Sequence, residues 1–478
     1  MKELFAGEVS ALLDRLAELA EEDRHARDVR TEDLKEALIA VTACLPVYRT
    51  YIRDSHISET DRAWIEKAIA VAGKGPAFTF LRRVLLVEPA WYLQQRKQEY
   101  LLFAMRWQQF TGPVMAKGLE DTAFYAHNPL VSVNEVGGDS NGPELYFGVE
   151  EFHRRNLERH TGSPHTMNAS STHDTKRSED VRARINVLSD VPEEWARCLR
   201  RWSRLNPSES APDRNEQVLI YQSMLGAWPI EPDRLKQYVR KALREGKTHT
   251  NWIDVNEKYE ERVLSFVETL YRNEDFLKDF TRFQKKLAYF GALYSLSQLV
   301  LKLTSPGIAE FYRGTELWDF SLADPDNRRP ADFNACIQTL DGLKQDARPK
   351  ELLKNWSDGR IKMYVTWKVL NFRRLHSDLF LDGDYIPLHV TAPRQDHIIA
   401  FARRLQGQCC VVAVPRLLAK LTRPGSPPLG EKIWQDTEIE LPPGMPAHWT
   451  NVLTNEELSL PLRVSALFSA LPLSVVSG

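Results

Sequence analysis

A histidine and an aspartate stand side by side at positions 173 and 174, in the string Ser-Thr-His-Asp-Thr-Lys-Arg that covers 171–177. His173 offers a hydrogen-bond donor, Asp174 offers a carboxylate, and Lys176 and Arg177 offer charged anchors. This combination suits a site that holds sugar hydroxyls and stabilises an oxocarbenium-like transition state, which requires nearby carboxylates. The same residues fit a structural alternative equally well, in which Asp174 and Lys176 pair on the surface and a neighbouring Ser or Thr caps a helix.

A second polar segment, Lys117–Thr122, places two acids beside a lysine. Lys117, Glu120 and Asp121 could orient a polar substrate. Local chemistry favours a simpler interpretation, a helix N-terminus whose acids are stabilised by the helix dipole. A third segment, 312–319, combines Tyr, Trp and acids, and it fits either a sugar-binding surface or the edge of a core.

Patterns for metals, nucleotides and other cofactors are weak in this sequence. The histidines between 153 and 173 lack the spacing of a metal-binding motif, so we expect no metal and no cofactor. The Gly-Gly pair at 137–138 has neither a P-loop nor a GxGxxG pattern around it. The basic pairs Arg200-Arg201 and Arg403-Arg404 are interpreted as solvated faces of a helix or a strand.

The composition narrows the class of partner. The 478 residues include 63 Lys and Arg and 65 Asp and Glu, a formal net charge of −2, which offers no field to gather nucleic acid or an anionic membrane. Five cysteines without a CxxC pair fit a reducing compartment. No stretch approaches the roughly 18 apolar residues that a membrane span needs. We therefore expect a cytoplasmic protein whose partners include neither nucleic acid nor a membrane.

The spacing of apolar residues predicts helices over residues 1–108. The composition then changes, and 109–140 is predicted as a short strand followed by a long loop. Further strand-to-loop units are predicted at 165–177 and 306–318, and helices fill most of the stretch between them. After about residue 384, short alternating apolar segments separated by turn residues predict an antiparallel β domain.

Polar loops after successive strands are typical of a (β/α)8 barrel, in which the active site lies at the carboxyl ends of the strands. A whole barrel needs eight strands, and this sequence shows about three. The predicted fold class is therefore α/β: the C-terminal part of a (β/α)8 barrel with large helical insertions, followed by a small antiparallel β domain. The predicted domains are a helical insertion region at 1–108, barrel strands and loops at 109–345 with a helical insertion at about 190–280, and the last barrel helix with the β domain at 346–478.

Several strings of this chain resemble the maltooligosyltrehalose synthase family of the α-amylase clan, in the same order along the chain. They are LPVYRTYI (45–52), FTGPVMAKGLEDTAFY (110–125), LVSVNEVGGDS (130–140), STHDTKRSEDVRARINVLSD (171–190), HTNWIDVNEKYE (249–260), GTELWDFSLADPDNRRP (314–330) and GDYIPLHV (383–390). The resemblance spans nearly the whole chain. The KGLEDTAFY and STHDTKR strings are far more specific than a bare His-Asp pair.

Members of that family convert the reducing-end α-1,4 bond of a maltooligosaccharide into an α,α-1,1 bond, which caps the chain with a trehalose unit. The resemblance implies the logic of a retaining glycosidase, with an Asp nucleophile and a Glu general acid/base. It implies that Asp174 stabilises the transition state and that His173 contacts a substrate hydroxyl. The other substrate-binding residues that we expect are Lys117, Glu120, Asp121, Lys176 and Arg177.

The sequence departs from the family where the nucleophile is expected. It contains no GxRxD-type strand end, and no Glu before residue 108 follows a convincing strand. We therefore expect this chain to lack the nucleophile and the acid, to be inactive alone, and to need an N-terminal half that a separate chain could supply. Arg313 stands where the family more often has Gln. Two alternatives are a non-catalytic glucan-binding or regulatory derivative of the family, and a fragment of an ordinary α-glucan hydrolase.

Overall fold

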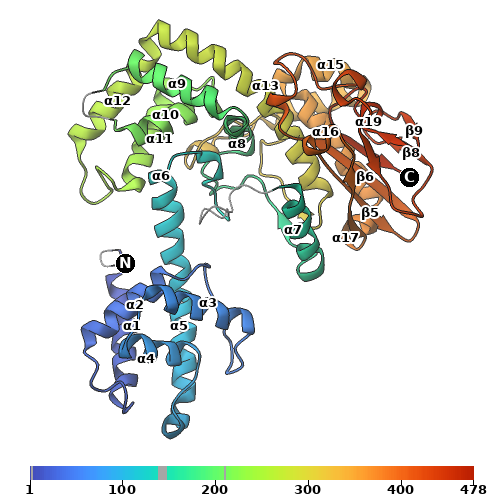
Figure 1. Cartoon of the computed structure of the whole chain (residues 1–478). Coiled ribbons are helices and arrows are strands. Elements are labelled where there is room, and N and C mark those ends of the chain that lie inside the picture. The colour runs from blue at the N-terminus through green and yellow to red at the C-terminus, as the bar shows by residue number, and fades with distance from the viewer. Residues whose placement is uncertain (2–3, 138–147, 209–211) are drawn as a thin grey trace. The chain divides into compact units, whose positions relative to one another are not determined.

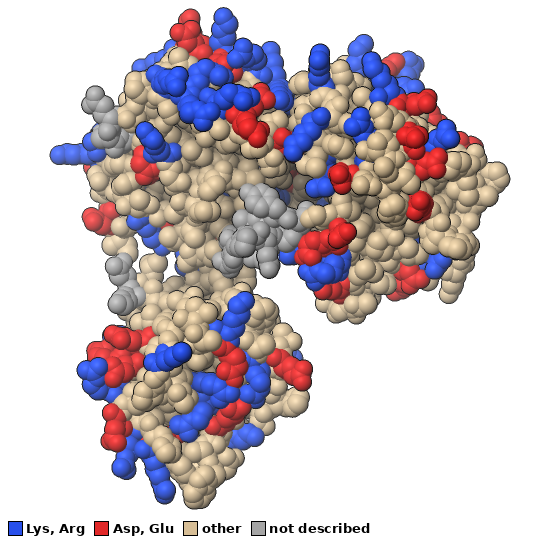
Figure 2. Space-filling model, viewed as in Figure 1, with Lys and Arg blue, Asp and Glu red and all other residues tan. Residues whose placement is uncertain are grey.

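The computed structural model describes Met1 and residues 4–137, 148–208 and 212–478. The chain divides into two compact units, Met1–Tyr125 and Ala126–Gly478 (Figure 1). No helix in the described ranges is long and apolar enough to cross a membrane. Lys and Arg are interspersed with Asp and Glu on the face drawn in Figure 2. Residues 138–140, which end one of the predicted loops and include Gly138, lie outside the described residues.

The first unit is helical, as the apolar spacing predicts. Its helices are α1 (Ala6–Glu21), α2 (Thr31–Ala43), α3 (Glu59–Ala72), α4 (Pro76–Leu85), the 3-10 helix η1 (Trp91–Arg96) and α5 (Lys97–Met115). α1 buries Leu12, Leu16 and Leu19, and this spacing of three to four residues gives one apolar face. Trp107 of α5 is completely buried, and its indole N–H donates to Thr42 Oγ1 at 2.9 Å.

The strand predicted within 109–140 is wrong, because α5 is followed directly by a π-helix, η2 (Ala116–Ala123), and by the short helix α6 (Phe124–Ala126). Gly112 and Pro113 suggested a break in the helix, yet both lie inside α5. Phe110 is buried in the core, and the Gln108 carboxamide holds Ile52 by two main-chain hydrogen bonds of 2.9 and 2.8 Å. This tertiary packing outweighs the low helix propensity of Gly and Pro.

The second unit contains the helices predicted between residues 178 and 304. They are α8 (Glu179–Asn186), α9 (Pro192–Leu205), α10 (Arg214–Ala227), α11 (Pro232–Gly246), α12 (Glu257–Arg272) and α13 (Glu274–Thr304), and α7 (Val149–Gly162) precedes them. Trp202 of α9 is completely buried, and its ring centroid lies 5.2 Å from that of Tyr221 and 5.5 Å from that of Phe276. These edge-to-face contacts tie α9, α10 and α13 together.

Two very short parallel strands lead into the polar loops. β1 (Met167–Asn168) pairs with β2 (Ile308–Ala309) in the register Met167↔Ile308 and Asn168↔Ala309, so the strands predicted at 165–177 and 306–318 are confirmed. Gly307 has a φ of +124°, and a Cβ there would lie 2.6 Å from Asn168 Nδ2, so glycine is required for this close approach. Met167 and Ile308 are 64% and 43% exposed, so this small sheet is open to solvent.

The predicted antiparallel domain is confirmed after residue 384, and α14 (Phe333–Gln345), α15 (Pro349–Lys354), α16 (Arg360–Leu375) and α17 (Ser377–Leu381) connect it to β2. A six-stranded sheet has the order β3-β5-β6-β11-β8-β9, and a three-stranded sheet has the order β10-β7-β4. The elements are β3 (Asp384–Pro387), β4 (His389–Val390), β5 (Ile398–Leu405), β6 (Gln408–Pro415), α18 (Glu431–Trp434), β7 (Glu438–Glu440), β8 (His448–Asn451), β9 (Glu457–Ser459), β10 (Leu462–Arg463), α19 (Val464–Leu467) and β11 (Ser474–Ser477). Gln406 and Gly407 both have positive φ, which suits the two-residue turn between β5 and β6.

The interpretation of Arg403 as part of a solvated face is wrong. Its side chain is completely buried, and its guanidinium donates to Thr304 O at 3.2 Å, Phe380 O at 3.0 Å and Gly383 O at 2.8 Å. Burial lowers the pKa of Arg403 to about 10. The arginine thus joins the β domain to the end of α13, because it donates to carbonyl groups of both.

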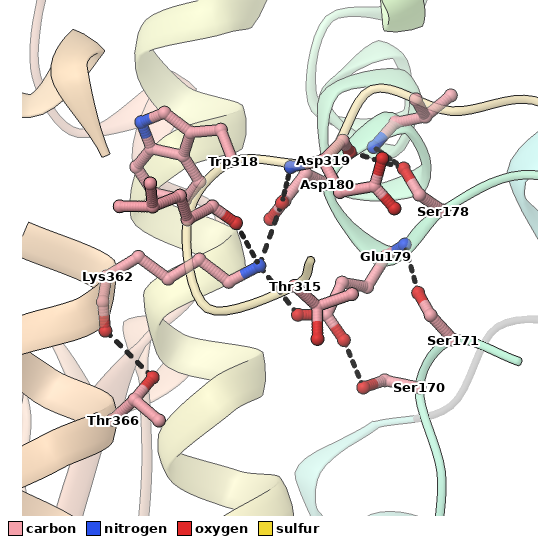
Figure 3. Close-up of polar contacts among 12 residues, drawn as sticks. Ser170, Ser171, Ser178, Glu179, Asp180, Thr315, Trp318, Asp319, Lys362 and Thr366 are labelled. Atoms are coloured by element: carbon pink, nitrogen blue, oxygen red, sulfur yellow. Dashed lines mark hydrogen bonds and ion pairs between the residues drawn. The ribbon is translucent and has the colours of Figure 1, made fainter. Parts of the chain in front are cut away.

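A buried ion cluster joins α8, α13 and α16, and Figure 3 shows the part of it that Glu179, Asp180 and Lys362 form. Lys362 of α16 is completely buried, and its ammonium lies 2.7 Å from Glu179 Oε1 and 2.8 Å from Asp180 Oδ2. Lys302 of α13 lies 3.4 Å from Glu179 Oε2, and it donates to Ser170 Oγ at 2.8 Å. Because Ser170 follows β1, the cluster fixes the base of the loop that carries His173 and Asp174.

Attraction between opposite charges holds the cluster together, because its groups are buried away from water. Burial raises the pKa of Glu179, but the charges of Lys362 and Lys302 outweigh burial and hold that pKa at about 2. Burial and the adjacent Glu179 charge raise the pKa of Asp180. Burial lowers the pKa of Lys362, yet the two carboxylates raise it above its ordinary value, so Lys362 is a cation at neutral pH.

We expect Lys362→Met to lower the free energy of unfolding by about 3–5 kcal/mol at pH 7, because two buried carboxylates lose their shared cation. Without that cation, burial raises the pKa of the Asp180 carboxyl further above its unfolded value of about 4, and the pKa of Glu179 also rises because Lys302 is the cation that stays beside it. The folded state then binds more protons than the unfolded state, so the loss is full above the raised pKa values and shrinks as the pH falls toward 4.

Denaturant unfolding at pH 7 and pH 5 measures this effect. Lys344→Met is the matched control, since the Lys344–Asp341 pair at 3.1 Å is exposed, and it should change stability by less than about 0.5 kcal/mol at either pH. An equally small effect of Lys362→Met would contradict the role of the cluster.

Candidate functional site

The loop after β1 presents His173 and Asp174 to solvent at the tip of a turn. Asp174 N donates to Thr172 Oγ1 at 3.2 Å, and the Thr175 hydroxyl donates to Thr172 O at 2.9 Å. Threonine hydroxyls that bond to nearby main-chain groups stabilise turns of this kind. Both His173 and Asp174 are exposed, whereas Thr175 is buried. The sequence-predicted pair is therefore accessible, and its backbone is fixed from both sides.

Glu135 anchors the far side of this loop. Its carboxylate is buried, and it accepts hydrogen bonds from Lys176 N at 2.8 Å and from Arg177 N at 3.2 Å. Arg182 of α8 lies 3.7 Å from the same carboxylate. A carboxylate that accepts two successive main-chain N–H groups sets the direction of the chain, so Glu135 positions the loop without being exposed itself.

Lys176 and Arg177 are buried, unlike His173 and Asp174 on the same loop. The Lys176 side chain is only 4% exposed, and its ammonium lies 3.8 Å from Asp174 Oδ1. Arg177 is completely buried, and its guanidinium donates to Val131 O at 3.1 Å and to the Tyr238 hydroxyl at 2.7 Å. In this arrangement Arg177 contacts protein atoms, while Lys176 places a cation directly behind an exposed carboxylate.

The loop after β2 supports the loop after β1. Asn327, in the 3-10 helix η6 (Asp326–Arg328), donates from Nδ2 to His173 O at 3.0 Å. The Tyr312 hydroxyl donates to Asn327 O at 3.2 Å, and Arg313 donates to Arg328 O at 3.0 Å. The parallel strands therefore bring together two loops that are separated by more than 130 residues in the sequence, since β1 ends at 168 and β2 begins at 308.

The chemistry of this site follows from its construction. One exposed carboxylate and one exposed imidazole stand on a turn whose main chain is held by Glu135, Asn327 and two threonines. A polar group held in a fixed position can stabilise charge that develops in a transition state without reorganising. The arrangement suits recognition of a polar, uncharged ligand and stabilisation of a developing positive charge.

Lys117, Glu120 and Asp121 belong to the first unit, where they lie on the π-helix η2. Lys117 Nζ lies 2.5 Å from Asp121 Oδ2, and the buried Glu120 accepts a hydrogen bond from the Tyr48 hydroxyl. The predicted helix N-terminus is absent at this position, because α5 runs directly into η2. π-Helical turns inside α-helices occur frequently at functional sites. These three residues thus form one group, and the residues of 173–177 form another.

A cavity of about 800 Å³ lies in the second unit, beside β1. Its lining includes Asn168 and Ser170 from the β1 segment, Arg182 from α8, and Tyr294 and Lys302 from α13. None of the seven sequence-predicted site residues lines it. The cavity therefore borders the base of the loop, whereas His173 and Asp174 lie at the tip of that loop.

One group of described residues has the spacing of a metal site. Ligand atoms of Asp213, Glu216 and His249 all lie within 4.8 Å of one another. The two acids already form the capping box of α10, and His249 Nε2 lies 3.0 Å from Asp213 Oδ2. These contacts account for the group as local structure, so it provides no independent reason to place a metal there.

Glu135 and Asn327 support the candidate site, and the sequence reasoning missed both. Both lie in strings that were singled out, LVSVNEVGGDS and GTELWDFSLADPDNRRP. In each string, an acid or an amide stands near Gly or Pro residues. That pattern only weakly indicates a side chain that holds a loop in place. Their partners lie 41 and 154 residues away in the sequence, a separation that no local pattern can report.

Comparisons with known proteins agree with the resemblance. No protein-family model matches the chain. A Mycobacterium tuberculosis (strain H37Rv) protein, provisionally named a maltooligosyl trehalose synthase, is 36% identical over 376 residues, which cover 77% of this chain and 45% of that protein. Maltooligosyltrehalose synthase from Arthrobacter ramosus matches in structure with a TM-score of 0.79 and 30% identity, over 100% of this chain and 58% of that one.

A hypothetical maltooligosyl trehalose synthase from Sulfolobus tokodaii also matches in structure, with a TM-score of 0.70 and 29% identity, over 98% of this chain and 58% of that one. The agreement extends through both units and the β domain, because these matches cover nearly the whole chain. By sequence and by structure, this chain is a homologue of the maltooligosyltrehalose synthases that spans about half the length of the curated relatives it matches.

Proposed function

We propose that this chain forms part of a glucan mutase that converts the reducing-end α-1,4 bond of a maltooligosaccharide into an α,α-1,1 bond. The observation that carries the proposal is the loop after β1, where His173 and Asp174 are exposed on a turn fixed by Glu135 and Asn327. An uncharged substrate fits a site built from one carboxylate and one imidazole. The homologues' names supply the reaction type, and the loop supplies residues suited to it.

Asp174 stabilises the positive charge that develops at the anomeric carbon, and His173 binds a sugar hydroxyl. Lys176 keeps its cation 3.8 Å behind Asp174, and Arg177 acts by holding the loop. Lys117, Glu120 and Asp121 line the subsites for the reducing-end glucose. In the first unit, the Lys117–Asp121 pair and the Tyr48–Glu120 hydrogen bond hold these groups in fixed positions.

The reaction consumes no water and exchanges no electrons. The bond between C1 of the penultimate glucose and O4 of the last glucose breaks, O4 takes a proton from the general acid, and a carboxylate nucleophile holds C1. The released glucose reorients and its anomeric hydroxyl attacks C1, which breaks the bond from C1 to the carboxylate and frees the nucleophile. The hydroxyl proton returns to the same acid/base residue. The nucleophile and the acid in this scheme are residues from outside these 478.

β1 and β2 are two adjacent strands of a (β/α)8 barrel whose other strands are supplied by sequence outside this chain. Three observations support this part of the proposal. The parallel pair is open, since Met167 and Ile308 are exposed; a cavity of about 800 Å³ lies beside β1; and parallel sheets are ordinarily covered on both faces. An N-terminal half, on the same or a separate polypeptide, would pair with these edges.

The remaining assignments belong to the same proposal. Residues 1–108 form a helical insertion, 109–345 carry the C-terminal barrel strands with a helical insertion at about 190–280, and 346–478 carry the last barrel helix and the β domain. A cytoplasmic location fits the five cysteines, all of which are free thiols. A non-catalytic glucan-binding derivative is the competing function, and the following experiment separates the two.

A chimera tests the proposal directly: this chain replaces the region that it matches in the Arthrobacter ramosus enzyme, because that match covers 100% of this chain. With maltopentaose, we expect the chimera to remove reducing ends and to form a non-reducing, trehalose-capped product, while the isolated chain leaves the reducing ends unchanged. Asp174→Asn in the chimera should lower kcat by about 10²–10³-fold, because a fixed charge is lost from the transition state.

Product analysis by chromatography and a reducing-sugar assay distinguish the outcomes. Release of glucose or maltose would indicate a hydrolase instead. Glucan binding without turnover by the folded chimera would favour the non-catalytic derivative. Conversion by the isolated chain would show that its nucleophile lies within these residues.

Glu135→Gln in the chimera tests the positioning of the loop. The amide turns one acceptor oxygen into a donor that faces the main-chain N–H groups of Lys176 or Arg177, so the turn shifts. A shift of about 1 Å at a reacting group lowers the rate by about 10²-fold. We expect this loss in kcat, with KM changed less than about threefold because remote subsites are intact.

The control is Glu158→Gln, which removes an exposed carboxylate that pairs with Arg154 on α7. Steady-state kinetics of both variants should show full activity for this control. A normal kcat for Glu135→Gln would contradict the positioning role, whatever its effect on melting temperature.

A further inference from the structure

The connection between α11 and α12 is a compact loop with its own hydrogen-bond network. Asn251 Oδ1 accepts from Ile253 N at 2.8 Å and from Asp254 N at 2.7 Å, which closes a tight turn. The Thr250 hydroxyl donates to Glu260 Oε1 at 2.9 Å and accepts from Asn256 N at 3.0 Å. This loop, 248–256, is therefore held by its own polar side chains and by the start of α12.

The fixed loop presents Trp252 and Ile253 to solvent. Trp252 is 53% exposed and Ile253 is 77% exposed. A tight polar network that orders an indole but leaves half of it exposed gains only part of the free energy that full burial of an aromatic ring supplies. The ordering of this side chain therefore calls for an explanation other than core packing.

The indole of Trp252 is supported on one face. The Arg244 guanidinium of α11 lies 5.0 Å from the ring centroid, and Arg244 is itself held by Glu260 through two hydrogen bonds of 2.8 Å. Glu260 is buried, and Arg240 adds a second cation 3.7 Å from it. The chain of contacts from Glu260 to Arg244 to Trp252 fixes the orientation of the ring, and the exposed remainder of the indole faces solvent.

We propose that loop 248–256 is a second glucan-binding site, in which a glucose ring of an α-1,4-glucan stacks on the open part of Trp252. The proposal rests on the glucan substrate proposed above, and it adds a site separate from the loop that carries His173 and Asp174. A pyranose ring presents a face of C–H groups that packs on an indole, and its hydroxyls bond to polar groups at the edge of the ring.

The surroundings favour a sugar over a protein partner. Charged and polar side chains border the two apolar residues, among them the exposed Asp254, Asn256 and Glu257. A stable protein interface needs about 1,000 Å² or more of buried area with an apolar centre, and two adjacent apolar side chains in a polar rim fall short of it. A single stacked sugar with hydroxyl contacts needs no larger area.

Binding of maltoheptaose to the 478-residue chain tests the proposal, with titration followed by ligand-observed NMR or calorimetry. Trp252→Ala should weaken binding by about tenfold, the equivalent of one lost stacking contact. Trp252→Phe keeps an aromatic face, and it should remain within about threefold of the parent chain. Ile253→Ser, on the same loop, and Glu158→Gln, on α7, should leave this affinity unchanged. Asp174→Asn is measured alongside them to report on binding at the other loop, and circular dichroism checks that each variant is folded.

The outcomes separate this inference from the proposed reaction. Binding that survives Trp252→Ala but falls with Asp174→Asn would overturn the second site and leave the proposed substrate intact. The absence of binding by the parent chain, together with turnover by the chimera described above, would do the same. An equal effect of Ile253→Ser and Trp252→Ala, accompanied by concentration-dependent self-association, would identify the loop as a protein contact and overturn the proposal.

Discussion

One buried ammonium group determines much of the second unit. Lys362 lies between Glu179 and Asp180 at 2.7 and 2.8 Å, and these two acids begin α8, the helix that follows the His-Asp loop. Adjacent carboxylates in the interior would repel each other and lack hydration, so the position of α8 depends on the cation that α16 supplies. Lys302 extends the cluster to Ser170, and the main-chain N–H of Asp319 donates to Asp180 at 2.8 Å. The segments after both parallel strands are thus tied to one network.

The candidate site also combines buried polar groups with exposed neighbouring side chains. Glu135 and Arg177 are buried and form hydrogen bonds to other groups of the protein. His173 and Asp174, on the same loop, are exposed to solvent. A pair of exposed side chains on an otherwise polar loop would be mobile, and the fixed main chain limits that freedom. In the first unit, the buried Glu120 of the π-helix η2 accepts a hydrogen bond from Tyr48, and the Lys117–Asp121 pair of the same helix is more exposed. Rigid support of accessible polar groups is the feature that the two groups share.

The small parallel sheet and the β domain show two solutions to the pairing of strands. The six-stranded antiparallel sheet is paired within the chain, and its central strands are buried. β1 and β2 have two residues each, and their apolar side chains are exposed. Parallel pairs of this length gain little stability by themselves, so the buried ion cluster and the close approach at Gly307 add support to the main-chain hydrogen bonds between the two strands.

The sequence alone determined the elements whose signal is local. The apolar spacing of α1 and of the helices between 178 and 304, the alternating strands after 384, and the His-Asp turn could all be predicted, because each depends on residues a few positions apart. The motifs also identified the family.

The sequence could not show that Gly112 and Pro113 lie inside a helix, that Arg403 is buried, or that Glu135 anchors 176–177. Those features depend on partners brought together by packing. α5 gains burial that outweighs poor propensity, Arg403 donates to three carbonyls of other segments, and Glu135 accepts from N–H groups 41 and 42 residues away. Local spacing therefore decided the elements and the chemistry on offer, and tertiary contacts decided which polar groups are buried supports and which are exposed to a ligand.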